Sequence, residues 1–385
     1  MEFQSVETEA IDDDRIEVRA RVGAARLELR LPSRRFSPRA LGDALVLSAL
    51  VPAMREGSAL RLPDDLPVSS CLVAALPAIQ RTYRNWNVRL HEVVLEATTY
   101  EPDHEGTGTA LFYAGGVDSS YSLIAHEGEL DALVAVLGFD MHMDEEEMAA
   151  SRARNTAFAR ALGKEIVFVE STHRGFLRTL GVSRTFVFGA MLASAALLLG
   201  LRRCYIASSH SVGHLRPEGS HPTLDPLCSN GTTAIVHDDV TVSRLDKTRA
   251  IATRPDVLAN LRVCWDQPND NCGTCLKCLR TMAALRLCGV AGPFPPLDDL
   301  GVVRRMASHT ELDYVVEMAV SAHRQGDVEL YRRLRQGLRR QDFVEALRHL
   351  AYAVTGRKMR RPSRSRNALE LELVKYDLRP DLDLR

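Results

Sequence analysis

The sequence predicts an α/β protein built on a parallel sheet, with an N-terminal α+β domain and a helical C-terminal region. Two patterns support this. Between residues 110 and 208, short apolar runs typical of strands buried on both faces alternate with helical stretches. From residue 280 to 356 the apolar spacing is helical throughout. Because parallel strands need crossover connections, the alternating part is expected to form βαβ units.

Length and composition restrict the class of protein. The 385 residues exceed what one hydrophobic core usually supports, so two or three domains are expected. Apolar residues make up 45% of the chain and charged residues 26%, which excludes a disordered or disulfide-dense protein. The formal net charge of -1 gives no overall attraction to polyanions. We place domain boundaries near residues 105 and 290, which gives the domains 1–105, 106–290 and 291–385.

The N-terminal part contains signals for both strands and helices. Residues 15–31 alternate between apolar and polar around a Val-Gly-Ala break, which predicts a hairpin. Apolar spacing predicts helices over 40–54 and 71–83 and a strand over 88–97. The polar, glycine-containing segment 98–108 then reads as a linker.

The central part is expected to alternate strands and helices. Strands are predicted at 110–114, 132–137, 165–169 and 204–208, with helices at 119–127, 144–162 and 183–200. The most apolar stretch, 186–201, is about 16 residues long, shorter than the roughly 20 that cross a bilayer. It therefore predicts a buried helix and no membrane contact. The acidic N-terminus lacks the pattern of a signal peptide, so we expect a cytoplasmic location.

A glycine-rich loop follows the first strand of this central part. It reads Tyr113-Ala114-Gly115-Gly116-Val117-Asp118-Ser119-Ser120, between a predicted strand and a predicted helix. Glycines let the backbone approach a phosphate, and exposed amides at a helix N-terminus favour its charge. Ser119 and Ser120 can donate hydroxyl hydrogen bonds, and Asp118 can cap the helix, orient the loop or help to hold Mg²⁺. The alternative is an ordinary strand-to-helix turn in which Asp118 or Ser119 is the N-cap.

This loop resembles the Ser-Gly-Gly-X-Asp-Ser motif of the PP-loop ATP pyrophosphatases, the adenine-nucleotide α-hydrolase superfamily. The match covers Gly115, Gly116, Asp118 and Ser119, while Ala114 stands where the family has its first Ser. The resemblance implies a HUP-like, doubly wound parallel sheet. It also implies that residues 114–120 bind ATP with Mg²⁺ and that ATP is cleaved between its α and β phosphates. The loop is neither a Walker A motif nor a dinucleotide fingerprint, because Gly-Lys-Ser/Thr and Gly-X-Gly-X-X-Gly are both missing.

Four of the eight cysteines crowd into one polar segment. The spacing is C-x7-C-x2-C-x2-C, with Gly273 providing a turn, and the residues are Cys264, Cys272, Cys275 and Cys278. Four thiolates complete a tetrahedral zinc site and leave no open position, so this cluster predicts a structural Zn²⁺ ion. An iron–sulfur cluster is the main rival, and a chance group of free thiols is the plain alternative. The apolar settings of Cys71, Cys204 and Cys288 predict core positions.

The order of the two motifs, glycine loop first and cysteine cluster about 150 residues later, is similar to that of the 7-cyano-7-deazaguanine synthase (QueC) family. The resemblance covers about residues 108–285. It implies an ATP-dependent, AMP-forming enzyme that joins nitrogen to a carboxylate, with a 7-deazaguanine carboxylate as the suggested substrate. The N-terminal and C-terminal parts have no counterpart in that family.

Polar residues after the later strands are candidates for substrate contact. Ser209 and His210 follow the strand predicted at 204–208, at the carboxyl edge where parallel sheets bind ligands. His221 and Asp225 lie in the next loop and are expected to contact the polar edge of a heterocycle. The alternative is that these residues only form turns and caps. After the second strand, Gly138 and Phe139 are expected to line the adenine base, with Asp140 bordering the adenosine.

Basic residues near 247 are candidates for phosphate contact. PP-loop relatives carry a lysine near this point, which implies that Lys247 meets the pyrophosphate or the charge of the transition state, with Arg244 as the second choice. With Asp118, these residues form the predicted catalytic set. The alternative is an exposed helix start with Asp246 near its N-cap.

The leading hypothesis is adenylation of a carboxylate, or of an amide, on a small-molecule or protein acceptor, followed by attack of a nitrogen nucleophile. One alternative is a PP-loop enzyme that inserts sulfur into a base or tRNA, for which Cys228 in a polar loop is a candidate thiol. Another is a zinc-containing nucleic-acid-binding protein with a vestigial loop. Nucleic acid is the less favoured partner, because aromatic residues are scarce among the C-terminal arginines. Similar synthases imply a homodimer.

Overall fold

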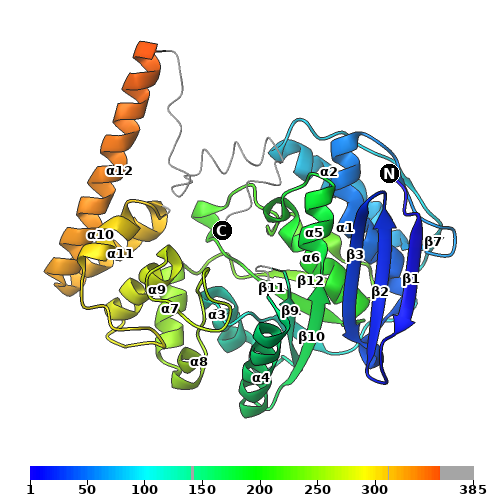
Figure 1. The fold of residues 1–385 in the computed structure, drawn as a ribbon, viewed down its shortest axis with the longest axis horizontal. Helices are drawn as coiled ribbons and strands as arrows, with labels where there is room; N and C mark the ends of the chain where they lie inside the picture. Colours follow the sequence, from blue (N-terminus) through cyan, green and yellow to red (C-terminus); the bar gives the residue numbers. More distant parts are fainter. Residues whose placement is uncertain (140–142, 311, 356–385) are drawn as a thin grey trace. The chain divides into compact units, whose positions relative to one another are not determined.

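The computed structural model describes residues 1–139, 143–310 and 312–355 (Figure 1). The chain forms two compact units. Among the described residues, the first comprises residues 1–114 and 122–241, and the second comprises residues 115–121 and 242–355. Asp140 and the basic stretch 357–366 lie outside the described residues.

The first unit is a mixed α/β structure around one eight-stranded sheet, in the order β1-β2-β3-β10-β9-β8-β11-β12. The five strands from β8 to β12 pair in parallel, whereas β1, β2 and β3 pair antiparallel, and β3 is antiparallel to β10. A mostly parallel central sheet was predicted and is confirmed. The strands are β1 (Ser5–Ala10), β2 (Arg15–Val22), β3 (Ala25–Pro32), β8 (Thr109–Phe112), β9 (Ala132–Leu137), β10 (Glu165–Ser171), β11 (Arg203–Ala207) and β12 (Ala234–Asp238).

The order of the parallel strands reverses beside β8. The chain continues from β8 to β9 and β10 on one side, then returns to β11 and β12 on the other. Since crossover connections are right-handed, this reversal places α4 (Glu145–Ala161) and α6 (Arg184–Leu198) on opposite faces of the sheet (Figure 1). Sheets of this kind bind ligands outside the carboxyl ends of the strands at the reversal. Here those ends belong to β8 and β11.

The N-terminal strands extend this sheet instead of forming a domain of their own. The predicted hairpin is β2 and β3, joined by a turn in which Gly23 has φ +57°. Leu29 and Arg30 of β3 then pair with Ser171 and Glu170 of β10. This pairing joins the N-terminal residues to the sheet of the first unit, and the second unit resumes at residue 242, so the two compact units do not divide the chain near 105 and 290.

Two buried helices pack against each other in the first unit. They are α1 (Leu41–Glu56) and α6, which is the apolar helix predicted from the sequence. No helix among the described residues is long and apolar enough to cross a membrane. The other helices of this unit are α2 (Ser70–Trp86), α5 (His173–Thr179) and the second half of α3 (Val117–His126). Short 3₁₀ turns lie at Ser33–Arg35, Pro38–Ala40, Val212–His214 and Asp225–Cys228.

The strand predicted over 88–97 is mostly wrong. Only β6 (Leu95–Glu96) pairs there, with β4 (Leu60–Arg61), and a second short pair joins β5 (Val68–Ser69) to β7 (Thr99–Tyr100). The preceding residues bond to side chains instead. The amide of Val93 donates to Gln80 Oε1 at 2.8 Å, and the amide nitrogen of Gln80 donates back to the Val93 carbonyl at 3.1 Å. These bonds occupy backbone groups that a sheet would need.

The second unit contains only helices and loops among its described residues. Helix α9 packs against α7, α10 and α11, and α12 packs against α10 and α11. The predicted helical region is confirmed except at 288–300, where Gly289 has φ +70° and three prolines follow. The helices are α7 (Arg244–Ala252), α8 (Pro255–Ala259), α9 (Leu276–Leu287), α10 (Gly301–Ala307), α11 (Leu312–Gln325) and α12 (Val328–Thr355).

Candidate functional site

The two glycines of the loop after β8 differ in what they do. Gly115 has φ +73°, its carbonyl accepts from the Arg262 amide at 2.7 Å, and a Cβ would lie 3.3 Å from the Asn260 carbonyl oxygen. The fold therefore needs glycine there. Gly116 has no left-handed φ, and a Cβ built on it meets no atom within 4 Å. Open space thus borders the backbone of Gly116. Neither the backbone conformation nor the packing of the fold requires glycine at this position.

Helix α3 begins directly after these glycines. The Ser119 hydroxyl and the Ser120 amide both donate to the Gly116 carbonyl, at 3.3 and 2.9 Å. The Ser120 hydroxyl is buried and makes no hydrogen bond to any described residue. Val117 is buried, whereas Ala114 is exposed. The first amides of a helix have no partner within the helix, so this turn is suited to an anion.

Two cations of α7 converge on Asp118. Arg244 Nη1 lies 2.7 Å from Asp118 Oδ2, and Lys247 Nζ lies 3.9 Å from Oδ1. Only 2% of the Lys247 side chain is exposed. Asp118 Oδ1 is buried and accepts no hydrogen bond from any described residue. The structure therefore brings together the three residues of the predicted catalytic set, all within the second unit.

The start of α7 explains how Arg244 and Lys247 come to lie side by side. Ser243 is the N-cap, and its hydroxyl accepts from the Asp246 amide at 3.1 Å. Three residues apart on one helix, Arg244 and Lys247 share a face. The alternative reading of an exposed helix start holds for Asp246 but not for Lys247, because the lysine is buried.

Residues of α9 and α11 surround Arg244, and sequence reasoning did not find them. The guanidinium of Arg244 lies 5.8 Å from the ring centroid of Tyr314, and that of Arg280 lies 4.5 Å from it. A cavity of about 20 Å³, room for one water molecule, lies between the three helices. Its polar lining comes from Arg244, Thr248, Arg280, Thr281, Tyr314 and Glu317. The local sequence around the residues of α9 and α11 contains no motif, so the sequence did not indicate that they lie near Arg244.

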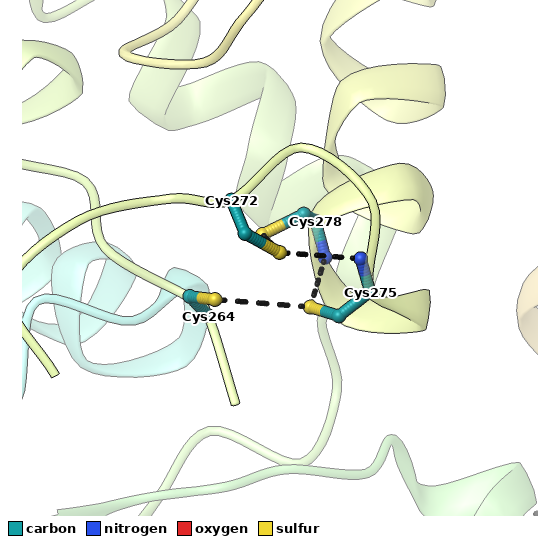
Figure 2. Close-up of side chains that lie close together, drawn as sticks. All are labelled: Cys264, Cys272, Cys275 and Cys278. Carbon is teal, nitrogen blue, oxygen red and sulfur yellow. Dashed lines mark hydrogen bonds between the residues drawn. The ribbon is translucent and has the colours of Figure 1, made fainter. Parts of the chain in front are cut away.

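The four predicted metal ligands lie together in the second unit (Figure 2). Their Sγ atoms all fall within 4.8 Å of one another, and two of the pairs, Cys264 with Cys275 and Cys272 with Cys278, are 4.0 Å apart. Sulfurs at about 2.3 Å from a tetrahedral zinc ion would be about 3.8 Å apart. The cluster can therefore hold a metal ion such as zinc.

The backbone around the cysteines is shaped for thiolates. The Asp266 and Gln267 amides donate to Cys264 Sγ, and the Thr274 and Cys275 amides donate to Cys272 Sγ, at 3.3 to 3.4 Å. The hydrogen bond from Cys278 lowers the pKa of the Cys275 thiol. The thiolate, and not the protonated thiol, is the form of cysteine that binds a metal ion.

Asn271 holds the two arms of the cysteine loop together. Its Oδ1 accepts from the Val263 amide at 2.9 Å, and its amide nitrogen donates to the Leu261 carbonyl at 2.9 Å. Gly273 has φ +71°, as the predicted turn requires. Cys275 is the N-cap of α9, since its sulfur accepts from the Cys278 amide at 3.5 Å. A bound metal would therefore anchor the start of α9.

The predicted substrate residues belong to the first unit. Ser209 is exposed directly after β11. His210 Nε2 lies 2.9 Å from Glu218, and His221 Nδ1 lies 2.7 Å from Thr223. His221 also contacts Trp86 edge to face, with 5.3 Å between ring centroids. His210 and His221 therefore already have protein partners in this loop region.

Asp225 is engaged inside the fold. Its side chain has no exposed surface, and its Oδ2 accepts from Ser220 and from His237 Nδ1, both at 2.8 Å. The Asp225 carboxylate therefore holds the loop and β12 together and is not open to a substrate. His237 was not predicted, because β12 is a short strand with a polar end that sequence reasoning missed.

The predicted adenine-lining residues follow β9. Gly138 has φ +75°, and a Cβ there would lie 2.9 Å from the Ser171 carbonyl oxygen, so the turn requires glycine. Phe139 is buried and packs on Phe188, with ring centroids 4.9 Å apart. Its ring is part of the core of this unit.

The other cysteines differ from expectation in two places. Cys228, placed by sequence in a polar loop, is fully buried, and burial raises the pKa of its thiol well above the usual value. Cys71, predicted in the core, is exposed in the first turn of α2. Cys204 is buried as predicted, and Cys288 is half-buried.

Comparisons with known proteins do not add a family to this picture. No protein-family model matches the sequence, and neither a curated protein nor a solved structure matches the chain. The chemistry of the residues described above is therefore the basis for a function.

Proposed function

We propose that this chain is an ATP-dependent, AMP- and pyrophosphate-forming enzyme that adenylates a carboxylate for attack by a nitrogen nucleophile. The observation that carries the proposal is the convergence of Arg244 and the buried Lys247 on Asp118 at the first turn of α3. A triphosphate bound at this turn would meet two cations and a helix N-terminus. A buried lysine beside a carboxylate is costly for stability alone, which favours a functional role.

In this proposal residues 114–120 form a PP-loop in a HUP-like fold. The open space beside Gly116 receives phosphate oxygens, and the first amides of α3 donate to them. The Asp118 Oδ1 atom, which accepts no hydrogen bond from the described residues, fits a ligand of Mg²⁺, a cation that prefers oxygen. Mg²⁺ would neutralise charge on the phosphates. Lys247 and Arg244 stabilise the charge that develops on the departing pyrophosphate.

The proposed reaction has two steps. An oxygen of the acceptor carboxylate attacks the α phosphorus of ATP, the bond to the bridging oxygen of the β phosphate breaks, and pyrophosphate leaves. The nitrogen nucleophile then attacks the acyl carbon, AMP leaves with the carboxylate oxygen, and the nitrogen loses a proton. The protein contributes positioning and charge stabilisation. A 7-deazaguanine carboxylate remains the suggested acceptor.

The strand order supports this assignment of the loop. Residues 113–116 follow β8 and Ser208 and Ser209 follow β11, the two strands at which the order of the sheet reverses. This is the position at which doubly wound sheets bind nucleotides. The four cysteines would hold zinc as a structural ion, because four thiolates leave no position for water.

The sulfur-insertion alternative loses its candidate thiol. Cys228 is buried and its pKa is raised, so it is a poor nucleophile at neutral pH. That alternative would then need an iron–sulfur cluster at the four cysteines, which the visible absorption of anaerobically purified protein would reveal.

The test is product analysis with ATP, Mg²⁺, 7-carboxy-7-deazaguanine and ammonia, comparing wild type with Gly116→Ala. Alanine fits the fold at this position, but its methyl group would occupy the proposed phosphate space. The matched control is Gly128→Ala, because Gly128 also has open space around a Cβ and no left-handed φ, but lies at the far end of α3. We expect AMP and pyrophosphate from wild type and the control, and roughly a hundredfold less from Gly116→Ala.

Three other results would count against the proposal in different ways. Formation of ADP would overturn the assignment of the loop. If Gly116→Ala were as active as wild type, the phosphates would not bind in the space beside Gly116. Binding of ATP without turnover would reject the acceptor, and the same assay repeated with other carboxylates would then identify the correct one.

A further inference from the structure

One polar face of α11 contacts α7 along its length. Tyr314, Glu317 and Ser321 are spaced so that they lie on the same side of the helix. Tyr314 meets the guanidinium of Arg244 at 5.8 Å, the Glu317 carboxylate accepts from the Ser243 hydroxyl, and the Ser321 hydroxyl accepts from Arg249 at 2.8 Å. Each contact falls on a different residue of α7.

Two of these contacts act on the position of Arg244. Ser243 is the N-cap of α7 and precedes Arg244, so Glu317 fixes the end of the helix from which Arg244 projects. The ring of Tyr314 then lies near the Arg244 guanidinium, whose Nη1 is 2.7 Å from Asp118. An arginine side chain has several rotatable bonds, and holding it in place before a ligand arrives lowers the cost of binding.

The ring of Tyr314 also contacts a cation of α9, the helix whose first turn contains two of the four cysteines. The Arg280 guanidinium lies 4.5 Å from the Tyr314 centroid, and Arg280 is only two residues after the ligand Cys278. Arg280 is 9% exposed and Lys247 is 2% exposed, so charge gathers here with little water to screen it. The cations Arg244, Lys247 and Arg280 outnumber the carboxylates of Asp118 and Glu317 in this region, and an anionic ligand would offset the remaining positive charge.

We propose that α11 is part of the nucleotide site, with Tyr314 and Glu317 as positioning residues that hold Arg244 for the phosphates. This inference rests on the proposed function. It assigns a role to a helix at residues 312–325, beyond the segment 108–285 that the resemblance to the QueC family covers. Tyr314 and Glu317 act through Arg244 and do not themselves touch the ligand.

The experiment measures the dissociation constant of Mg-ATP for the full chain, together with kcat and KM for AMP formation. Tyr314→Leu keeps the bulk of the side chain but removes the aromatic face, and Tyr314→Phe restores the ring. Glu317→Ala removes the acceptor of the Ser243 hydroxyl. Matched controls are Val316→Ala and Val320→Ala, because both valines lie on α11 with 43% and 44% of their surface exposed.

We expect Tyr314→Leu and Glu317→Ala to raise the dissociation constant and the KM for ATP by roughly 3- to 30-fold. Tyr314→Phe and both valine controls should stay within about twofold of wild type. Because Tyr314 acts through Arg244, adding Tyr314→Leu to Arg244→Ala should weaken binding little further than Arg244→Ala alone.

Failure of this inference is distinguishable from failure of the proposed function. If Arg244→Ala loses Mg-ATP but Tyr314→Leu and Glu317→Ala bind it like wild type, α11 has no part in the site while the proposed function stands. If Val316→Ala weakens binding as much as Tyr314→Leu, the effect is general loss of the helix, and the positioning role is overturned. If the wild-type chain binds no Mg-ATP, the proposed function and this inference both fall.

Discussion

The amino group of Lys247 is buried, since only 2% of the lysine side chain is exposed. Its Nζ has the Asp118 carboxylate at 3.9 Å and the Tyr121 ring centroid at 5.7 Å. Removing one member of a buried ion pair is strongly destabilising only when the other charge is left unpaired, and after Lys247→Met the Asp118 carboxylate keeps Arg244 at 2.7 Å. We therefore expect Lys247→Met to fold but to lower kcat for AMP formation by about 100- to 1,000-fold, the range found when one charge-stabilising donor is removed.

The control for this variant is Arg254→Met, which removes a cation paired with Asp256 outside the proposed site. Its kcat should equal that of wild type. Steady-state kinetics with both variants, after their far-ultraviolet circular dichroism spectra have been compared, make the measurement. A Lys247→Met protein that folds and forms AMP at the wild-type rate would show that the buried amino group has a structural role only.

His126 is expected to make the first unit more stable at mildly acidic pH. Its Nε2 lies 2.7 Å from Asp238 and its Nδ1 lies 2.7 Å from Glu129. Burial opposes protonation, but the two carboxylates outweigh it and raise the pKa of His126 in the folded chain. The stabilisation is therefore fully present below the unfolded pKa of about 6.5 and is lost as the pH rises through the higher folded value.

We expect His126→Gln to lower the free energy of unfolding by about 1 to 2 kcal/mol near pH 6 and by less as the pH rises. Urea unfolding can be followed by fluorescence of Trp86, in the first unit, in a Trp265→Phe background. The exposed His104 provides the control, because His104→Gln removes only a surface contact with Asp103. A difference that stays constant or grows between pH 6 and 8.5 would rule out the charged His126 bridge.

Single residues of the site could be predicted where a local motif marks them. Asp118 follows the glycines, and the resemblance to the PP-loop family pointed to Lys247, with Arg244 as the second choice. Tyr314, Glu317 and Arg280 could not be found, because only packing of α7, α9 and α11 brings them to Arg244. Asp225 was assigned to substrate for the opposite reason. Its loop looked open, but Ser220 and His237 occupy the carboxylate.

At the scale of elements, strands buried on both faces were the easiest to predict. The apolar runs that become β8, β9 and β11 are buried along most of their length, and β10 shows the alternating burial of a strand with one buried face. The strand β12 was missed because Ala234–Asp238 ends in a histidine and an aspartate, and those side chains make buried polar contacts that no period reveals. The supposed strand over 88–97 failed because Gln80 takes the backbone bonds of Val93.

The cysteine loop and the start of α9 should depend on a bound metal. Purified protein is expected to contain about one zinc per chain by mass spectrometry, and Cys275→Ser to contain much less. Because Cys275 caps α9, metal loss should raise hydrogen exchange in the peptide spanning residues 264–287 while that of β8 and β9 stays unchanged.

Cys71→Ser is the control for the metal experiment, because Cys71 is exposed and lies in the first unit. It should retain both zinc and the wild-type exchange pattern. If the purified protein contains iron and absorbs visible light, the four cysteines hold an iron–sulfur cluster and not zinc. A Cys275→Ser variant with full zinc content would show that the four thiols do not form the metal site.

At the scale of the whole molecule, overall charge says little about function. The net charge of -1 does not reveal the local arrangement in which two cations of α7, Arg244 and Lys247, lie beside Asp118. The sequence predicted the α/β class and the helical C-terminal part. A separate N-terminal domain was predicted because apolar and polar residues alternate in these strands as they do in an isolated hairpin. Only the pairing of β3 with β10 shows that the strands continue the central sheet.

The most direct measurement follows the oxygen of the acceptor. A carboxylate substrate labelled with oxygen-18 is incubated with the enzyme, ATP, Mg²⁺ and ammonia, and the nucleotide products are analysed by mass spectrometry. If the carboxylate attacks the α phosphorus, each AMP released will carry one labelled oxygen, and pyrophosphate will carry none. Unlabelled AMP would mean that water attacks the phosphorus, and labelled phosphate with ADP would mean cleavage at the γ phosphate. Either result would contradict adenylation of the acceptor.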